Sequence, residues 1–283
     1  MIRPRGITPG GAPGGVSVGS RLTSDAQGVF FPVKRMALSH QRKITIVLLA
    51  LYWPTLFVFA HIPIPQVVRE AEVSDKGLHF FAYLVLTYLV WYAIRGQKKV
   101  NWRGIGPWCI LAGLAVYGVL DEWTQSFVAG RTCDARDFVA DMAGTLTGLI
   151  LCTVFAFWPA GLLVCAIVIF GLTNVTTANL GDLMPVTSGM YHLAAYAIFA
   201  AFWVQCIRHS RFGVRLPKIA PSDLVMTAAA PLALLLFVKV FSLMSGRAFG
   251  GRDMLISACG IGGVLAGVYL APFFRRREES RTT

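Results

Sequence analysis

Eight apolar stretches, each about 20 residues long, dominate the sequence. A helix needs about 20 residues to cross roughly 30 Å of hydrocarbon. Backbone polar groups in lipid must be satisfied within the spanning structure, which indicates helices for stretches of this length. The sequence therefore predicts an all-α integral membrane protein whose transmembrane helices lie at 44–62, 77–95, 104–121, 137–157, 159–176, 188–207, 223–242 and 253–273.

The composition supports a membrane protein and argues against most soluble classes. Hydrophobic residues make up 55% of the chain and charged residues 14%, whereas soluble domains carry about 25% charged residues. A soluble enzyme, a nucleic-acid-binding protein, a collagen-like fibre and a disordered chain are all disfavoured. The six cysteines form no CxxC pair and are interpreted as small hydrophobic residues. We expect the lipid bilayer as the main partner, with no nucleic acid, no metal and no cofactor.

The basic residues gather at alternate helix ends. One set of ends, including both termini, carries 19 basic and four acidic residues, and the other set carries seven basic and ten acidic residues. Because cytoplasmic segments hold the excess of Lys and Arg, we expect both termini in the cytoplasm. The pattern predicts a multi-pass membrane protein.

Four segments are predicted along the chain. Residues 1–43 are interpreted as a disordered basic cytoplasmic tail, with Met36 as an alternative true start. Residues 44–157 and 158–273 are predicted to hold four helices each. Residues 274–283 are interpreted as a second basic tail in the cytoplasm.

The two halves resemble each other in sequence. LHFFAY (78–83) aligns with YHLAAY (191–196), and GRTCDARDFVADMAGTLTG (130–148) aligns without gaps with GRAFGGRDMLISACGIGGV (246–264). Four helices per half give both halves the same orientation in the membrane, as in parallel repeats. In this alignment Asp121 and Glu122 correspond to Phe237 and Val238, which are not ionisable. We therefore expect any site to belong mainly to the first half.

Polar residues of the first half converge on one membrane face. The second and fourth predicted helices begin at this face and the third ends there, in the outer-leaflet headgroup region. Ionisable residues at membrane depth are energetically unfavourable and indicate a functional site. The candidate ligand-binding residues are Asp75, Lys76, His79, Tyr83, Asp121, Glu122, Gln125, Arg131, Arg136 and Asp137.

Ion pairs are expected among these residues, between two arginines and three carboxylates: Arg131 and Arg136 with Asp121, Glu122 and Asp137. A purely structural interpretation stays open beside this one. Asp134 or Asp137 would then cap the fourth helix, and His79 and Tyr83 would only hydrogen-bond between helices. Asp141, one turn into the fourth helix, is the hardest residue to explain in that way.

At these residues the sequence resembles the VanZ-like membrane family. The segments are SDKGLHFFAY (74–83) and DEWTQSFVAGRTCDARDFVADMAGTLTG (121–148). The resemblance covers about residues 45–157 well and 160–273 as a degenerate second copy. The chain departs from the family's sequence pattern in two ways. A position near Asp141 is often Asn in the family, and the second half lacks the acidic pair.

This resemblance implies a four-helix membrane module associated with the bacterial cell envelope. Together with the predicted topology, it leads us to expect a protein of the bacterial inner membrane. The founding member of the family is linked to low-level resistance to the glycopeptide teicoplanin. The family's candidate residues fall on Asp75, Lys76, His79, Tyr83, Asp121, Glu122, Gln125, Gly130, Arg131, Asp137 and Gly144.

Three functions follow as hypotheses. The first is an envelope protein whose outer-face polar pocket binds a lipid headgroup or a lipid-linked wall or polysaccharide precursor through Lys76, Arg131 and Arg136. The second is a membrane enzyme acting on a lipid-linked substrate, with Asp121 or Glu122 as base and His79 as acid. The third is a transporter that uses the buried Asp141 and Lys239. The ligand and the oligomeric state stay open.

Overall fold

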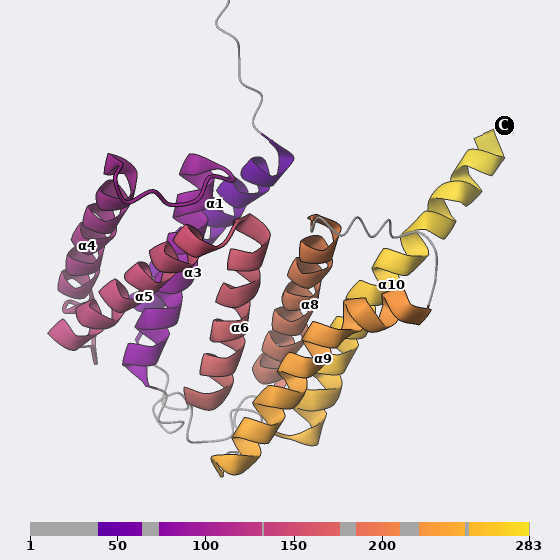
Figure 1. Cartoon of the computed structure of the whole chain (residues 1–283). Coiled ribbons are helices and arrows are strands. Elements are labelled where there is room, and N and C mark those ends of the chain that lie inside the picture. Colours follow the sequence, from indigo (N-terminus) through magenta and orange to yellow (C-terminus); the bar gives the residue numbers. More distant parts are fainter. Residues whose placement is uncertain are drawn as a thin grey trace, which may run out of the picture. The chain divides into compact units, whose positions relative to one another are not determined.

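The structure, a computed structural model, describes residues 39–63, 74–131, 133–175, 185–209, 221–246 and 249–282. All secondary structure in these residues is helical (Figure 1). The helices are α1 (His40–Ala60), α3 (Asp75–Arg95), α4 (Ile105–Gln125), α5 (Ala135–Val154), α6 (Phe157–Val175), α8 (Pro185–His209), α9 (Pro221–Met244) and α10 (Gly251–Thr282). By length and composition, all eight of these described helices can cross a membrane. The predicted all-α membrane fold is confirmed, and the chain is a multi-pass membrane protein in contact with the lipid bilayer.

Several helices are longer than the apolar stretches alone predict. The first helix begins at His40 because the Ser39 side chain accepts a hydrogen bond from the Arg42 backbone N–H. Residues 40–43, expected in the basic tail, are therefore helical, whereas residues 1–38 and the alternative start at Met36 lie outside the described residues. At the other end of the chain, α10 continues to Thr282. Its apolar span ends at Ala271, but arginine and glutamate are good helix formers outside the hydrocarbon too.

The core of the first half is built around α3. This helix packs against α1, α5 and α6, and Tyr83, Leu84, Leu86 and Trp91 on it are almost fully buried. It approaches α5 most closely at Gly144, where an added Cβ would lie 2.3 Å from the Phe80 carbonyl oxygen. Small residues at such crossings let two membrane helices pack backbone to backbone.

A second hydrophobic core lies in the other half, between α6, α8, α9 and α10. Here α8 and α10 approach most closely at Gly260, where an added Cβ would lie 2.5 Å from the Leu193 carbonyl oxygen. Helix α6 packs against both α3 and α8 and so joins the two cores (Figure 1).

Three helix ends of the first half meet at one end of the bundle. Helices α3 and α5 begin there, and α4 ends there at Gln125, one turn beyond the predicted end. These ends carry the polar residues that the sequence singles out.

Candidate functional site

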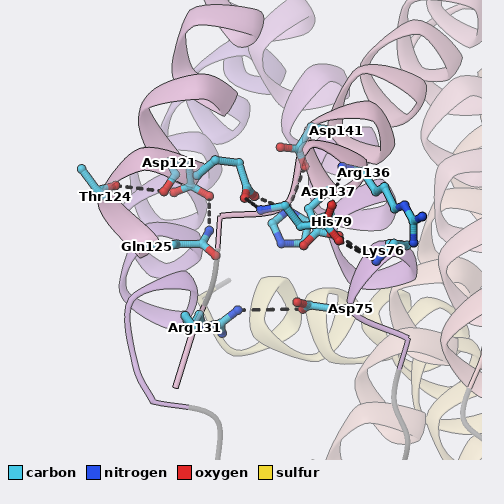
Figure 2. A network of polar contacts seen from close by, with 12 residues as sticks. Asp75, Lys76, His79, Asp121, Thr124, Gln125, Arg131, Arg136, Asp137 and Asp141 are labelled. Carbon is cyan, nitrogen blue, oxygen red and sulfur yellow. Dashed lines mark hydrogen bonds and ion pairs between the residues drawn. The ribbon is translucent and has the colours of Figure 1, made fainter. Parts of the chain in front are cut away.

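A cluster of polar side chains occupies the end of the bundle where α3 and α5 begin and α4 ends (Figure 2). The Ser74 side chain caps α3 by accepting from the Gly77 N–H, and Asp134 caps α5 by accepting from the Arg136 N–H. These caps fix where the first turns of both helices begin. The polar cluster consists of Asp75, Lys76, His79, Asp121, Glu122, Gln125, Arg131, Asp134, Asp137 and Asp141.

The buried centre of the polar cluster is formed by His79, Glu122 and Asp141. His79 Nδ1 lies 3.0 Å from Asp141 Oδ1 and 4.0 Å from Glu122 Oε1. The three residues are 8%, 4% and 0% exposed. Glu122 Oε1 and Asp141 Oδ2 have no hydrogen-bond partner among the described residues. One imidazole and two carboxylates, each from a different helix, thus face one another away from solvent.

Beside this centre, α4 is held by two further hydrogen bonds. Gln125 Nε2 donates to Asp121 Oδ2 at 2.6 Å, within one turn of the helix. The Thr124 hydroxyl lies 2.7 Å from His61 Nε2, which follows the last residue of α1. The end of α1 is therefore fastened to the end of α4 next to Asp121.

The rim of the polar cluster carries the more exposed ion pairs. Lys76 Nζ lies 3.2 Å from Asp134 Oδ2 and 3.5 Å from Asp137 Oδ1. Arg131 Nη1 lies 3.8 Å from Asp75 Oδ1, and its Nη2 donates to the Phe59 carbonyl oxygen at 3.4 Å. In Figure 2 the Arg131–Asp75 contact lies apart from the contacts around His79.

These contacts correct the predicted pairing of the arginines. Asp121, Glu122 and Asp137 are bound by Gln125, by the Asp134 backbone N–H and by Lys76 instead of by arginine. Arg136 is exposed, and the described residues give it no ion pair. The reason is topological: Arg136 is exposed, and Arg131, 12% exposed, pairs with Asp75 at the rim, whereas the carboxylates of α4 face inward.

Asp134 is the member of the rim with the clearest electrostatic effect. The hydrogen bond from the Arg136 backbone N–H, together with the Lys76 ammonium, holds the pKa of the Asp134 carboxyl below its usual range. A negative charge at this position also suits the positive end of the helix dipole. The predicted capping of the fourth helix is therefore present and made by Asp134.

The structure adds three residues to the predicted set. Asp141 is a direct neighbour of His79, and Asp134 forms an ion pair with Lys76. From the sequence, Asp141 was expected to be buried and Asp134 to cap a helix, but neither was among the candidate ligand-binding residues. His61 was not noted, because nothing near it in sequence links it to Thr124. Tyr83, in contrast, is buried with no hydrogen-bond partner for its hydroxyl among the described residues, and its ring lies 5.9 Å from that of Tyr117.

An apolar groove of about 560 Å³ runs beside α1 and α4, within the usual size range of small-molecule sites. Its lining residues are Ile46, Leu49, Ala50, Trp53, Pro54, Phe57, Val58 and Tyr117. One wall ends close to the polar cluster, because the Phe57 ring stacks on His61 with a centroid distance of 4.0 Å. A second wall residue, Tyr117, contacts Tyr83 near the buried centre. The groove and the polar cluster are thus adjacent.

The second half holds a smaller group of buried polar residues. His192 is 5% exposed, and its Nδ1 has no hydrogen-bond partner in the described part of the chain. Ser188 Oγ donates to Asp253 Oδ1 at 3.5 Å. Lys239 donates to the Phe249 carbonyl oxygen and lies over the Phe249 ring. Lys239 therefore has a backbone hydrogen-bond partner. This contact offers a structural role for Lys239 beside the transport role considered from the sequence.

Comparison with known proteins identifies the first half. Residues 27–156 match the sequence model of the VanZ/LLP1 family. No curated protein and no solved structure shows a significant match to the chain. The matched region includes all ten residues of the polar cluster and the four helices that surround it. The match covers just under half of the chain, and the first half of this membrane protein is therefore VanZ-like.

Proposed function

We propose that this protein binds an amphiphile of the cell envelope, with an apolar chain in the groove and a polar headgroup at the polar cluster. The observation that carries this proposal is the adjacency of the two features. Phe57 lines the groove and stacks on His61, and His61 hydrogen-bonds to Thr124 at the edge of the polar cluster. An anionic lipid and a lipid-linked precursor of wall or polysaccharide share this chemistry.

The rim of the polar cluster supplies the charges that a phosphate headgroup needs. Lys76, Arg131 and Arg136 all lie there, and arginine can donate two parallel hydrogen bonds to one phosphate. The present pairs of Lys76 and Arg131 span 3.2 to 3.8 Å and are partly exposed. The Lys76–Asp134 pair is exposed on both sides, and exposed pairs contribute only about 0–1 kcal/mol. A phosphate can therefore replace Asp134 as the partner of Lys76 at little cost.

The location of the headgroup site follows from the charge pattern. The end of the bundle with the polar cluster belongs to the acidic set of helix ends, which the positive-inside rule assigns to the outer side of the inner membrane. Lipid-linked wall precursors are exposed on that side. Altered presentation of such a precursor accounts for the glycopeptide tolerance that the family resemblance implies.

We also propose that the second half is a degenerate copy of the first. Its support is the matching backbone contact: Gly144 meets Phe80 and Gly260 meets Leu193, at offsets of 116 and 113 residues. The second copy retains the helix packing but has lost most ionisable residues. Its role is then to extend the membrane bundle rather than to form a second binding site.

The test is mass spectrometry of the lipids that remain on the purified full-length protein. We expect an isoprenoid phosphate or an anionic phospholipid. The first would identify a lipid-linked precursor as the ligand, and the second an anionic membrane lipid. Ala50→Trp fills the groove and Arg131→Ala removes a rim charge, so each should reduce the retained lipid several-fold. Ala258→Trp makes the same change at an exposed position of α10 and should leave retention unchanged. Equal retention by all four proteins would refute the proposal.

A membrane enzyme acting on a lipid-linked substrate is the second candidate function. The contact between His79 Nδ1 and Asp141 Oδ1 favours it, because a carboxylate that orients an imidazole is typical of general acid–base sites. Turnover of labelled lipid precursors, abolished by Glu122→Gln while lipid retention persists, would support the enzyme over simple binding. A protein that retains lipid but never turns it over would exclude this candidate.

A further inference from the structure

We propose that His79, Glu122 and Asp141 together hold one divalent transition-metal ion of the Zn²⁺ class. The three residues come from α3, α4 and α5, and their ligand atoms all lie within 4.8 Å of one another. This inference does not depend on the proposed lipid, because it rests only on the buried centre of the polar cluster.

The distances fit a metal ion after small movements. Around a tetrahedral ion with ligand bonds of about 2.1 Å, neighbouring ligand atoms lie about 3.4 Å apart. His79 Nδ1 is 3.0 Å from Asp141 Oδ1 and 4.0 Å from Glu122 Oε1. The two pairs that include His79 therefore need to change by less than about 1 Å. The Glu122–Asp141 pair, whose ligand atoms lie within 4.8 Å, needs to change by at most about 1.4 Å, and side-chain torsions can provide these movements.

The unmet hydrogen-bonding capacity of the carboxylates points to a bound cation. Glu122 and Asp141 are 4% and 0% exposed. Neither Glu122 Oε1 nor Asp141 Oδ2 accepts a hydrogen bond from any described residue. Buried charges are normally paired or coordinate a metal, since an uncompensated one costs several kcal/mol.

The balance of buried charge supports the same conclusion. Asp121 and Asp137, 4% and 5% exposed, raise the number of carboxyl groups buried in the polar cluster to four. His79 is the one basic side chain of the polar cluster that is equally buried. Lys76 pairs with Asp137, but a single imidazolium cannot neutralise the other three carboxylates when they are ionised. A divalent ion beside a neutral imidazole compensates two of them.

The surroundings also suit a metal centre. Glu122 Oε2 accepts from the Asp134 backbone N–H at 3.0 Å, which orients this carboxylate from outside, as outer partners of metal ligands do. Gly118 on α4 lets Asp141 approach this helix closely, because an added Cβ would lie only 3.3 Å from Asp141 Oδ2. Three protein ligands leave a fourth position for water or a substrate oxygen, as in catalytic zinc sites.

The second half provides an internal contrast. At the aligned positions it has His192, Val238 and Ser257, all buried. A valine cannot ligate a metal, and the remaining two side chains supply too few ligands for a structural or catalytic ion. We therefore expect one bound ion per chain.

The test uses the full-length protein in detergent, stripped with a chelator and titrated with Co²⁺ alone. Co²⁺ substitutes for Zn²⁺ in such sites and gives visible absorption bands that report its coordination. We expect saturation at one ion per chain and loss of the bands when Zn²⁺ is added. His79→Gln, Glu122→Gln and Asp141→Asn should each weaken binding by about tenfold or more.

Asp121→Asn is the matched control. It makes the same chemical change at a residue as buried as Glu122 and next to it in α4. Asp121, however, is not part of the group whose ligand atoms lie within 4.8 Å of one another, and its Oδ2 accepts from Gln125. This variant should bind Co²⁺ as the unchanged protein does. The proposal is overturned if the unchanged protein gives no saturable Co²⁺ bands, or if Asp121→Asn weakens binding as much as Glu122→Gln.

The outcomes for metal and for lipid are separable. Co²⁺ binding without retained lipid would refute the proposed function alone, and retained lipid without Co²⁺ binding would refute the metal site alone. Should one ligand variant fail to fold, the titration of the unchanged protein and the other two variants still decide the question.

Discussion

Replacing Gly144 by alanine tests whether the contact between α3 and α5 holds the first half together. The added methyl group would lie 2.3 Å from the Phe80 carbonyl oxygen and 3.1 Å from the Leu84 backbone nitrogen. Both neighbours are backbone atoms of a buried helix, so no side chain can rotate away. The two helices must separate by about 1 Å to restore ordinary contact distances, which loosens the packing on both sides of the crossing.

The size of the effect follows from two opposing contributions. Overpacking a tight site costs about 1–3 kcal/mol, and an immobile backbone on the other side places this site near about 3 kcal/mol. Alanine in place of glycine within a helix returns about 1 kcal/mol. The net expected loss in the free energy of unfolding is about 2 kcal/mol, or about a 30-fold change in the unfolding equilibrium constant.

The assay is reversible unfolding in mixed micelles, followed by tryptophan fluorescence as SDS is added. Gly113→Ala on α4 is the matched control, because an added Cβ there meets no atom within 4 Å. This control should be as stable as the unchanged protein or slightly more stable, since only the propensity gain remains. If Gly144→Ala proves as stable as Gly113→Ala, the close crossing of α3 and α5 is refuted.

Three further results are expected. Gly260→Ala should also lower stability, because its added Cβ would lie 2.5 Å from the Leu193 carbonyl oxygen; an unchanged SDS midpoint would contradict this. A membrane-impermeant maleimide should label the exposed Cys133 in intact cells and not the Cys133→Ser variant, whereas labelling only in inverted vesicles would reverse the proposed orientation. The lowered pKa of Asp134 means that its stabilising effect is complete above the ordinary aspartate pKa and is lost as the pH falls through the lowered value. Asp134→Asn should therefore reduce the acid sensitivity of the unfolding midpoint below about pH 4, the ordinary aspartate pKa, and an unchanged profile would count against the cap.

The sequence predicted the helices well because span length and apolarity are local properties. The observed α4 begins at Ile105, one residue after the start of the predicted stretch 104–121. Helix ends were less accurate, since α4 runs on to Gln125 and α10 to Thr282. Hydropathy locates the edge of the hydrocarbon, but hydrogen bonding and side-chain capping decide where the helix itself ends. The orientation and the internal repeat stay predictions.

The candidate site was predicted in outline but not in its pairing. Alternating helix ends already brought His79, Glu122 and Arg131 to one end of the bundle. The rotation of each helix then decided that Glu122 faces His79 and that Arg131 stays at the rim with Asp75. Asp141 became a neighbour of His79 for the same reason.

The sequence by itself therefore determined the class of protein and the end of the bundle that carries the polar residues. Both follow from counting apolar and charged residues along the chain, because an apolar stretch of about 20 residues satisfies its own backbone in lipid by forming a helix. The tertiary structure alone decided which side chains meet. His79 and Asp141 are 62 residues apart in sequence and 3.0 Å apart in space. Their meeting depends on the close crossing of α3 and α5 at Gly144, and no local pattern records how two helices rotate against each other.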